Sequence, residues 1–197
     1  MWIAIEGCIG AGKTTVAGLL AGMRGSSAIL ERYTDNPFLA KFYSEPSRYA
    51  LETELSFVLI HFHQVLHALR LAETAEHISD FHISKDHVYA EMNLHGDDLR
   101  VFENLYTSLS QRLPPPDVMV CLQCSDRLLL RRIEKRQRSV ETGLSSQYVR
   151  ALNRLYDDYF RTIPWPKVLV NGDEHDFVDD PSSVAWLSRE IDKRMRA

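Results

Sequence analysis

The residues IEGCIGAGKTT, at positions 5–15, form the most specific pattern in this sequence. They match the phosphate-loop pattern, in which Gly7 is followed by four residues and then by Gly12, Lys13 and Thr14. Residues 1–5 predict a short apolar strand, and the apolar spacing of residues 13–23 predicts a helix that begins near Lys13. Backbone N–H groups at such a turn converge on an anion. The segment therefore predicts a phosphate site, the alternative being a glycine-rich turn without a ligand.

Within this loop, Lys13 is expected to reach the outer phosphates of a nucleotide, and the Thr14 hydroxyl is expected to bind Mg²⁺. We expect the phosphates to be contacted by the whole loop, which consists of Gly7, Cys8, Ile9, Gly10, Ala11, Gly12, Lys13, Thr14 and Thr15.

The composition bounds the class of protein. The chain has 197 residues, a formal net charge of -4 and 45% hydrophobic residues, which suits one compact domain over residues 1–197. The negative charge argues against nucleic acid, so the expected partner is a small molecule.

No apolar run reaches membrane-spanning length and no cleavable signal precedes the first strand, which predicts a cytoplasmic protein with no membrane partner. The three cysteines fit a reducing compartment, and the CLQC segment follows an apolar strand rather than opening a helix, unlike a redox motif.

Strand and helix signals alternate along the rest of the chain. Apolar stretches predict further strands at residues 27–31, 77–81, 117–123 and 167–171. Helices are predicted at about 47–75, 97–112, 126–137 and 145–162, and after Pro181. Short apolar strands linked by helices form a parallel sheet that is covered on both faces and binds ligands at its carboxyl edge. We therefore expect an α/β fold of three layers with a five-stranded parallel sheet.

Two carboxylates are expected beside the phosphate site. Glu31 ends the second predicted strand and Asp80 lies at the end of the third. Because the carboxyl ends of parallel strands share one edge of the sheet, both side chains should face the anion, as in a phosphoryl-transfer site. The alternative is that each acid caps the element that follows it.

A cationic cluster lies in the segment 132–138. On a helix Arg132, Lys135 and Arg136 share one face, and Arg138 follows where the helix should end. Guanidinium groups can bridge a transferring phosphoryl group, so we expect an arginine-rich lid at about residues 132–145. By itself the cluster would better fit a solvated face paired with Glu134 and Glu141, but beside a phosphate loop the lid is favoured.

Five stretches, taken together and in order, resemble the deoxynucleoside kinases, especially the bacterial deoxyadenosine and deoxyguanosine kinase branch. They are IEGCIGAGKTT, ILERYTDNPFLAKFYSEPSRYALETEL, SDFHISKDHVYAEMNL, RRIEKRQRSVETGLSSQYVRALNRLYDDYF and VLVNGDEHDFVDDP. The resemblance spans nearly the whole chain and implies a P-loop NTPase-type fold. It also implies a homodimer formed through helices such as FVLIHFHQVLHAL, residues 57–69.

The resemblance implies that ATP, or another NTP, donates its γ-phosphoryl group to the 5′-hydroxyl of a deoxynucleoside, with a purine as the expected base and with Mg²⁺ bound by Thr14 and Asp80. Glu31 matches the family's general base, and catalytic roles are implied for Glu31, Lys13, Arg132 and Arg136. Further contacts to the donor are implied for Arg136, Arg138 and Asp173. Contacts to the substrate are implied for Glu31, Tyr43, Glu54, His61, Asp80, Asp86 and Glu141.

The sequence departs from the family pattern in the base pocket. Glu54 and His61 stand where the family usually has glutamine and arginine. An ionised Glu54 only accepts hydrogen bonds, which suits the N1–H and N2 amine of guanine, while His61 could donate to O6. Adenine or cytosine would need a protonated Glu54 or a shifted pose; alternatively, Glu54 pairs with His61 or another cation and only shapes the pocket. Phe81 replaces an arginine, and Lys85 could supply the missing charge.

Two other functions remain open from the sequence. A nucleoside-monophosphate kinase could use the same loop and lid, but it needs extra cations for its phosphate acceptor and no carboxylate base at Glu31. A nucleotide-binding regulator, or degenerate kinase, could retain Lys13 and have lost acceptor recognition at Glu54 and His61. Turnover with nucleosides and with monophosphates separates these functions.

Overall fold

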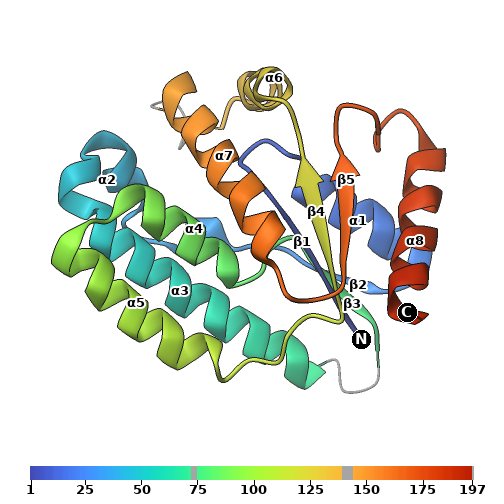
Figure 1. Ribbon diagram of the computed structural model, residues 1–197, viewed down its shortest axis with the longest axis horizontal. Helices are drawn as coiled ribbons and strands as arrows, with labels where there is room; N and C mark the ends of the chain where they lie inside the picture. The colour runs from blue at the N-terminus through green and yellow to red at the C-terminus, as the bar shows by residue number, and fades with distance from the viewer. Residues whose placement is uncertain (72–74, 139–143, 197) are drawn as a thin grey trace.

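A computed structural model describes residues 1–71, 75–138 and 144–196 of the protein (Figure 1). In chain order its elements are β1 (Trp2–Gly7), α1 (Lys13–Arg24), β2 (Ser27–Ile29), the 3₁₀ turn η1 (Tyr33–Asp35), α2 (Leu39–Ser44), α3 (Pro46–Leu71), β3 (His77–Ser79), α4 (Ser84–Asn93), α5 (Gly96–Ser110), β4 (Val118–Gln123), α6 (Asp126–Arg136), α7 (Ser146–Thr162), β5 (Lys167–Asn171) and α8 (Pro181–Arg196). No helix in these ranges has the length and apolar character needed to cross a bilayer.

The strands form one parallel sheet in the order β2-β3-β1-β4-β5. Strand β1 is central, with β3 and then β2 on one side of it and β4 and then β5 on the other. This order places the loop after β1 at the point where the direction of winding changes, which is where open α/β sheets bind ligands. The predicted α/β fold with five parallel strands is confirmed.

Helices cover both faces of the sheet, as Figure 1 shows: α1 and α8 lie on one side, and α3, α4, α5 and α7 lie on the other. All six residues of β1 are buried, because a parallel strand in this position is covered from both faces. The large core joins the strands to α1, α7 and α8. A second, smaller cluster joins α2, α3, α4 and α5 around Phe62 and Phe102.

Several boundaries differ from the sequence predictions. Strand β2 ends at Ile29, so Glu31 lies two residues beyond the strand, and Asp80 directly follows β3. Helix α4 was not predicted, because its Ser84, Lys85 and Asp86 are buried polar residues and break the apolar periodicity. The predicted end of the long helix, at residue 75, falls just after residues 72–74, which lie outside the described ranges.

The phosphate loop joins β1 to α1 through two glycines with left-handed backbone conformations, Gly10 (φ 85°) and Gly12 (φ 99°). A side chain is disfavoured at such angles. At Gly10, an added Cβ would also lie 2.9 Å from Cγ1 of Ile133 and 3.0 Å from the carbonyl oxygen of Leu129. The loop is therefore held tightly against α6.

We expect Gly10→Ala to lower the free energy of unfolding by about 1–2 kcal/mol or more, because it combines left-handed strain with a close backbone contact. Gly22→Ala is the matched control, since Gly22 lies inside α1 with open space around it. That change should raise the free energy of unfolding by about 0.5–1 kcal/mol. Urea denaturation of both variants measures the difference, and equal effects would contradict the strained loop.

Candidate active site

A cavity of about 820 Å³ opens at the carboxyl edge of the sheet. The phosphate loop forms one end, and helices α3 and α4 form the other. Residues at the end of α6, the segment 176–179 and Tyr43 of α2 complete the wall. A volume of this size suits a drug-sized ligand or a nucleotide.

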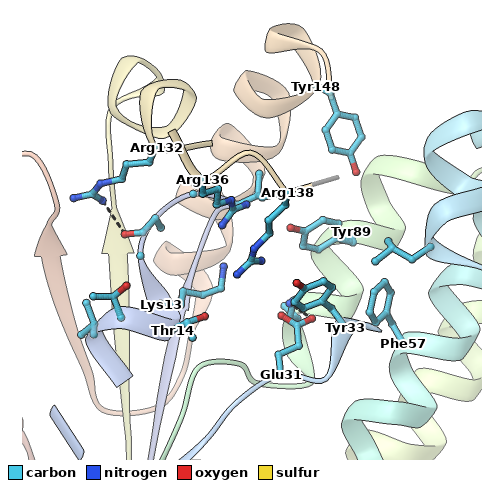
Figure 2. A pocket seen from close by; sticks show the side chains of 18 of the residues that line it. Lys13, Thr14, Glu31, Tyr33, Phe57, Tyr89, Arg132, Arg136, Arg138 and Tyr148 are labelled. Carbon is cyan, nitrogen blue, oxygen red and sulfur yellow. Dashed lines mark hydrogen bonds and ion pairs between the residues drawn. The ribbon is translucent and has the colours of Figure 1, made fainter. Parts of the chain in front are cut away.

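Lys13 lies in the floor of the cavity, against the phosphate loop (Figure 2). Its Nζ donates hydrogen bonds to the carbonyl oxygens of Gly7, at 2.7 Å, and Cys8, at 3.2 Å. Burial lowers the pKa of Lys13, and the positive charge of Lys85 lowers it further. A cation at the phosphate loop favours the binding of an anion there.

Thr14 and Asp80 meet beside the loop, as predicted. The Thr14 hydroxyl donates to Oδ2 of Asp80 at 2.5 Å, and Oδ1 of Asp80 accepts from the backbone N–H of Glu31 at 2.6 Å. Two oxygen donors at the loop fit Mg²⁺, which usually takes only one or two protein ligands together with phosphate and water. No cluster of three or more His, Cys, Asp or Glu side chains that could hold a metal occurs in the described part of the chain.

Glu31 is a partly buried carboxylate held by two cationic side chains. Its Oε1 accepts from Nζ of Lys85 at 2.7 Å and contacts Nε2 of His61 at 3.1 Å. Burial alone would raise the pKa of Glu31, but the charge of Lys85 and the hydrogen bond from His61 outweigh burial and hold that pKa well below its ordinary value. The carboxylate therefore stays ionised at neutral pH.

His61 bridges Glu31 to Asp86 and is fully buried. Its Nδ1 lies 2.7 Å from Oδ1 of Asp86. Burial would lower the pKa of His61, but the two carboxylates outweigh it and raise the pKa to about 9, so His61 is a cation at neutral pH. Because both ring nitrogens are engaged, His61 has no free donor for guanine O6 in this arrangement, contrary to the expectation from sequence.

Glu54 lies at the far end of the cavity and is 3% exposed. Its partner is Asn93, whose amide donates to Oε1 at 2.7 Å, and not His61. Burial raises the pKa of Glu54 to about 8, although the hydrogen bond from Asn93 opposes the shift. Glu54 therefore carries a proton at neutral pH in this structure, whereas the sequence argument for guanine assumed the ionised form.

The predicted lid arginines take different positions at the end of α6. Figure 2 shows Arg138 extending toward the space between Lys13 and Tyr33, and its guanidinium lies 4.8 Å from the centre of the Tyr33 ring. Arg132 points away from this space and donates to the carbonyl oxygen of Ala11 at 2.9 Å. Arg136 lies between them and lines the cavity. Glu141 and the rest of the segment 139–143 lie outside the described residues.

Asp173 lines a second cavity of about 500 Å³ and not the main one. Its carboxylate accepts from the backbone N–H and the hydroxyl of Ser125, each at 2.6 Å. Ser125 in turn caps α6. Asp173 therefore fixes the start of the helix that carries the arginines, and the two cavities share Arg131, Arg132 and Asp176.

Asn93 lines the cavity and Glu6 lies beside the phosphate loop, and neither was predicted from the sequence. Glu6 is fully buried beneath the phosphate loop and accepts from the N–H of His82 at 2.6 Å and of Gly7 at 3.3 Å. Burial raises its pKa to about 7. A charged residue inside an apolar strand was the available signal for Glu6; Asn93 offered none, because its helix α4 was itself not predicted.

The chain is similar to known proteins over its whole length. The profile of the deoxynucleoside kinase family matches residues 3–196. The deoxyguanosine kinase of Bacillus subtilis (strain 168) is 35% identical, over 96% of this chain and 95% of the relative. The deoxyadenosine kinase of Lactobacillus acidophilus is 27% identical, over 98% of this chain and 96% of the relative.

Solved structures agree on the fold. The deoxyadenosine kinase from M. mycoides with bound dCTP superimposes with a TM-score of 0.84 and 20% identity, over 98% of this chain and 100% of that one. A second structure of that enzyme gives a TM-score of 0.87 at 22% identity, over the same shares of the two chains. The resemblance found in the sequence is thereby confirmed, and the chain belongs to the deoxynucleoside kinase family.

Proposed function

We propose that this protein transfers the γ-phosphoryl group of ATP, or of another NTP, to the 5′-hydroxyl of a deoxynucleoside, with a purine as the base. The observation that carries the proposal is Glu31, a carboxylate kept ionised by Lys85 and His61 in the cavity that also contains Lys13. Such a group can accept the proton of an alcohol while the phosphate loop holds the donor.

In the proposed reaction, the 5′-oxygen forms a bond to the γ-phosphorus as the bond to the leaving diphosphate breaks. The hydroxyl proton passes to Glu31. Lys13 offsets the negative charge that spreads over the phosphoryl oxygens, and Arg136 and Arg138 add charge from the side of α6. Arg132 would join them only if its bond to Ala11 opened.

Thr14 and Asp80 are the proposed ligands of Mg²⁺, which when bound neutralises phosphate charge and orients the donor. Glu31 is linked to this pair through its backbone N–H, which donates to Asp80. We infer that Gly7 to Thr15, with Asp173 near the second cavity, serve the donor, and that Tyr43, Glu54 and Asp86 serve the nucleoside.

We also propose a cytoplasmic homodimer. All three cysteines are free and buried, which suits a reducing compartment. Leu59 on α3 and Val101 on α5 are exposed apolar residues on the outer helices, where a second copy could pack. Sedimentation measurements test the dimer.

A monophosphate acceptor is not favoured by the charges around the acceptor position. Lys85 and His61 are already neutralised by Glu31 and Asp86. A phosphate placed beside Glu31 would meet a carboxylate instead of free cations. A degenerate regulator would bind nucleotide without turnover.

The direct test supplies ATP or GTP, Mg²⁺ and each ribo- and deoxyribonucleoside or monophosphate, and identifies the product by mass spectrometry. We expect deoxynucleoside 5′-monophosphates. Phosphorylation of monophosphates only, or binding without turnover, would overturn the proposal.

Glu31→Gln should lower kcat by about 10²- to 10⁴-fold, because it preserves shape and removes the proton acceptor. Lys13→Ala should impair the enzyme by another route and weaken both donor binding and kcat, since it removes charge from the phosphate site. Steady-state kinetics and donor titration separate the two. Unchanged kcat in the Glu31→Gln enzyme would remove Glu31 from the base role.

Lys85→Met should raise the pKa of Glu31, because burial raises this pKa and the charge of Lys85 no longer lowers it. A base is lost when it is protonated, so the acid limb of the kcat profile should move to higher pH by about one unit or more. Lys193→Met is the matched control, since Lys193 pairs with Glu190 at 2.6 Å on the exposed face of α8. An acid limb that stays in place would show that Lys85 does not control the base.

Glu54→Gln tests base recognition. The ionised Glu54 suits guanine, and its pKa of about 8 means that ionisation increases as pH rises through 8. At pH 8.5 the ratio of kcat/KM for deoxyguanosine to that for deoxyadenosine should fall about ten- to a hundredfold in the variant. At pH 6.5 the two enzymes should be similar, since a protonated carboxyl donates and accepts as an amide does. Glu52→Gln, on the exposed side of α3, is the control; a ratio that does not change would make Glu54 structural.

A further inference from the structure

Three helices contribute one polar group each to a hydrogen-bonded row at the far end of the cavity. Glu54 comes from α3, Asn93 from the last turn of α4 and Tyr148 from the first turn of α7. The Asn93 amide donates to Oε1 of Glu54 at 2.7 Å, and the Tyr148 hydroxyl donates to Oδ1 of Asn93 at 3.1 Å. All three residues line the cavity.

Once Glu54 is ionised, above its pKa of about 8, the chemistry of the row fixes the orientation of its central amide. An ionised Glu54 can only accept, so Asn93 then turns its NH₂ group toward the carboxylate. The carbonyl oxygen of Asn93 then faces Tyr148, whose hydroxyl can donate to it. Turning the amide over would place two acceptors face to face at Glu54 and lose this bond.

We infer that Asn93 is a specificity-determining positioning residue: it holds Oε1 of Glu54 and so presents Oε2 to the base, where this oxygen accepts hydrogen bonds once Glu54 is ionised. This inference rests on the proposed function, because it concerns the same acceptor pocket. Tyr148 acts one step further away, by orienting Asn93.

The proposed role predicts a preference among purines. An amide donor stabilises the charged carboxylate more than the protonated one. The charged form accepts from the donors of guanine, whereas the protonated form presents a donor that suits the N1 acceptor of adenine. Loss of Asn93 should therefore shift the enzyme from deoxyguanosine toward deoxyadenosine.

Charged groups on two helices also act on Glu54, and their signs differ. Asp86 on α4 raises the pKa of Glu54, whereas Lys85 on α4 and His61 on α3 lower it. The Asp86 carboxylate and the two cations therefore shift the pKa of Glu54 in opposite directions. All three residues are unchanged in the variants used below.

Two phenols and one amide complete the surroundings of Glu54. Burial raises the pKa of Tyr148 on α7, so its hydroxyl keeps its proton between pH 6.5 and pH 8.5. Tyr43 on α2 lines the same cavity. Asn93 donates the hydrogen bond that directly favours the charged carboxylate.

The test measures competition between deoxyguanosine and deoxyadenosine, with ATP and Mg²⁺, from pH 6.5 to pH 8.5. In the wild-type enzyme the preference for deoxyguanosine should rise with pH. Asn93→Leu, which is similar in size and cannot donate, should lower the deoxyguanosine preference at pH 8.5 about tenfold or more. The pH at which this preference rises should then lie above 8.5. A loss of packing alone would change both substrates together and leave the pH dependence in place.

Two further variants protect the test against misfolding of Asn93→Leu. Asn93→Asp keeps the shape but places a second carboxyl beside Glu54, so one proton is retained between them and the deoxyguanosine preference should also be lost. Tyr148→Phe removes only the hydroxyl that orients Asn93. It should lower the deoxyguanosine preference by a smaller factor, about two- to fivefold. Gln123→Leu is the matched control, because Gln123 donates to Asp157 at 2.9 Å outside both cavities.

The outcomes separate this inference from the proposed function. If the wild-type enzyme phosphorylates no deoxynucleoside, the proposed function fails. If the wild-type enzyme is active and the folded Asn93 variants keep its purine ratio and pH dependence, Asn93 does not set specificity. A shift in Asn93→Asp and Tyr148→Phe, with Gln123→Leu unchanged, would support the inference.

Discussion

The ion pair between Glu31 and Lys85 is the interaction on which the arrangement of the site depends. A buried carboxylate without a partner would take up a proton, because burial penalises its charge. Lys85 prevents this at a distance of 2.7 Å, and His61 adds a second contact. The same bridge ties the loop after β2 to α3 and α4, so the charge of Glu31 and the packing of two helices are maintained together.

The parallel sheet supplies the other half of the site. Its central strand ends at Gly7 and delivers the phosphate loop to the switch point, and β3 ends one residue before Asp80. Asp80 then joins the two halves, since one carboxylate oxygen accepts from Thr14 of α1 and the other from the backbone of Glu31.

The sequence was sufficient to predict the fold and to place the phosphate-loop motif at the edge of the sheet. The phosphate loop is a local motif, and the apolar strands and amphipathic helices follow simple periods, so their order predicted the sheet. The base end was predicted less well, because its contacts join residues far apart in the chain. His61 pairs with Asp86 instead of Glu54, and Glu54 takes a proton because of burial that no local pattern reveals. Helix α4 was not predicted for a related reason. Its polar residues are buried, so the helix lacks the apolar periodicity by which a helix is recognised in a sequence.

The two separate hydrophobic clusters have a consequence for how this fold can diversify. The larger cluster stabilises the sheet beneath the phosphate loop, and the smaller one stabilises the helices α2 to α5 around the base end. A substitution in the base pocket therefore perturbs mainly the smaller cluster. New acceptors can therefore be accommodated by changes among helices α2 to α5, while the residues that bind the phosphate donor stay the same.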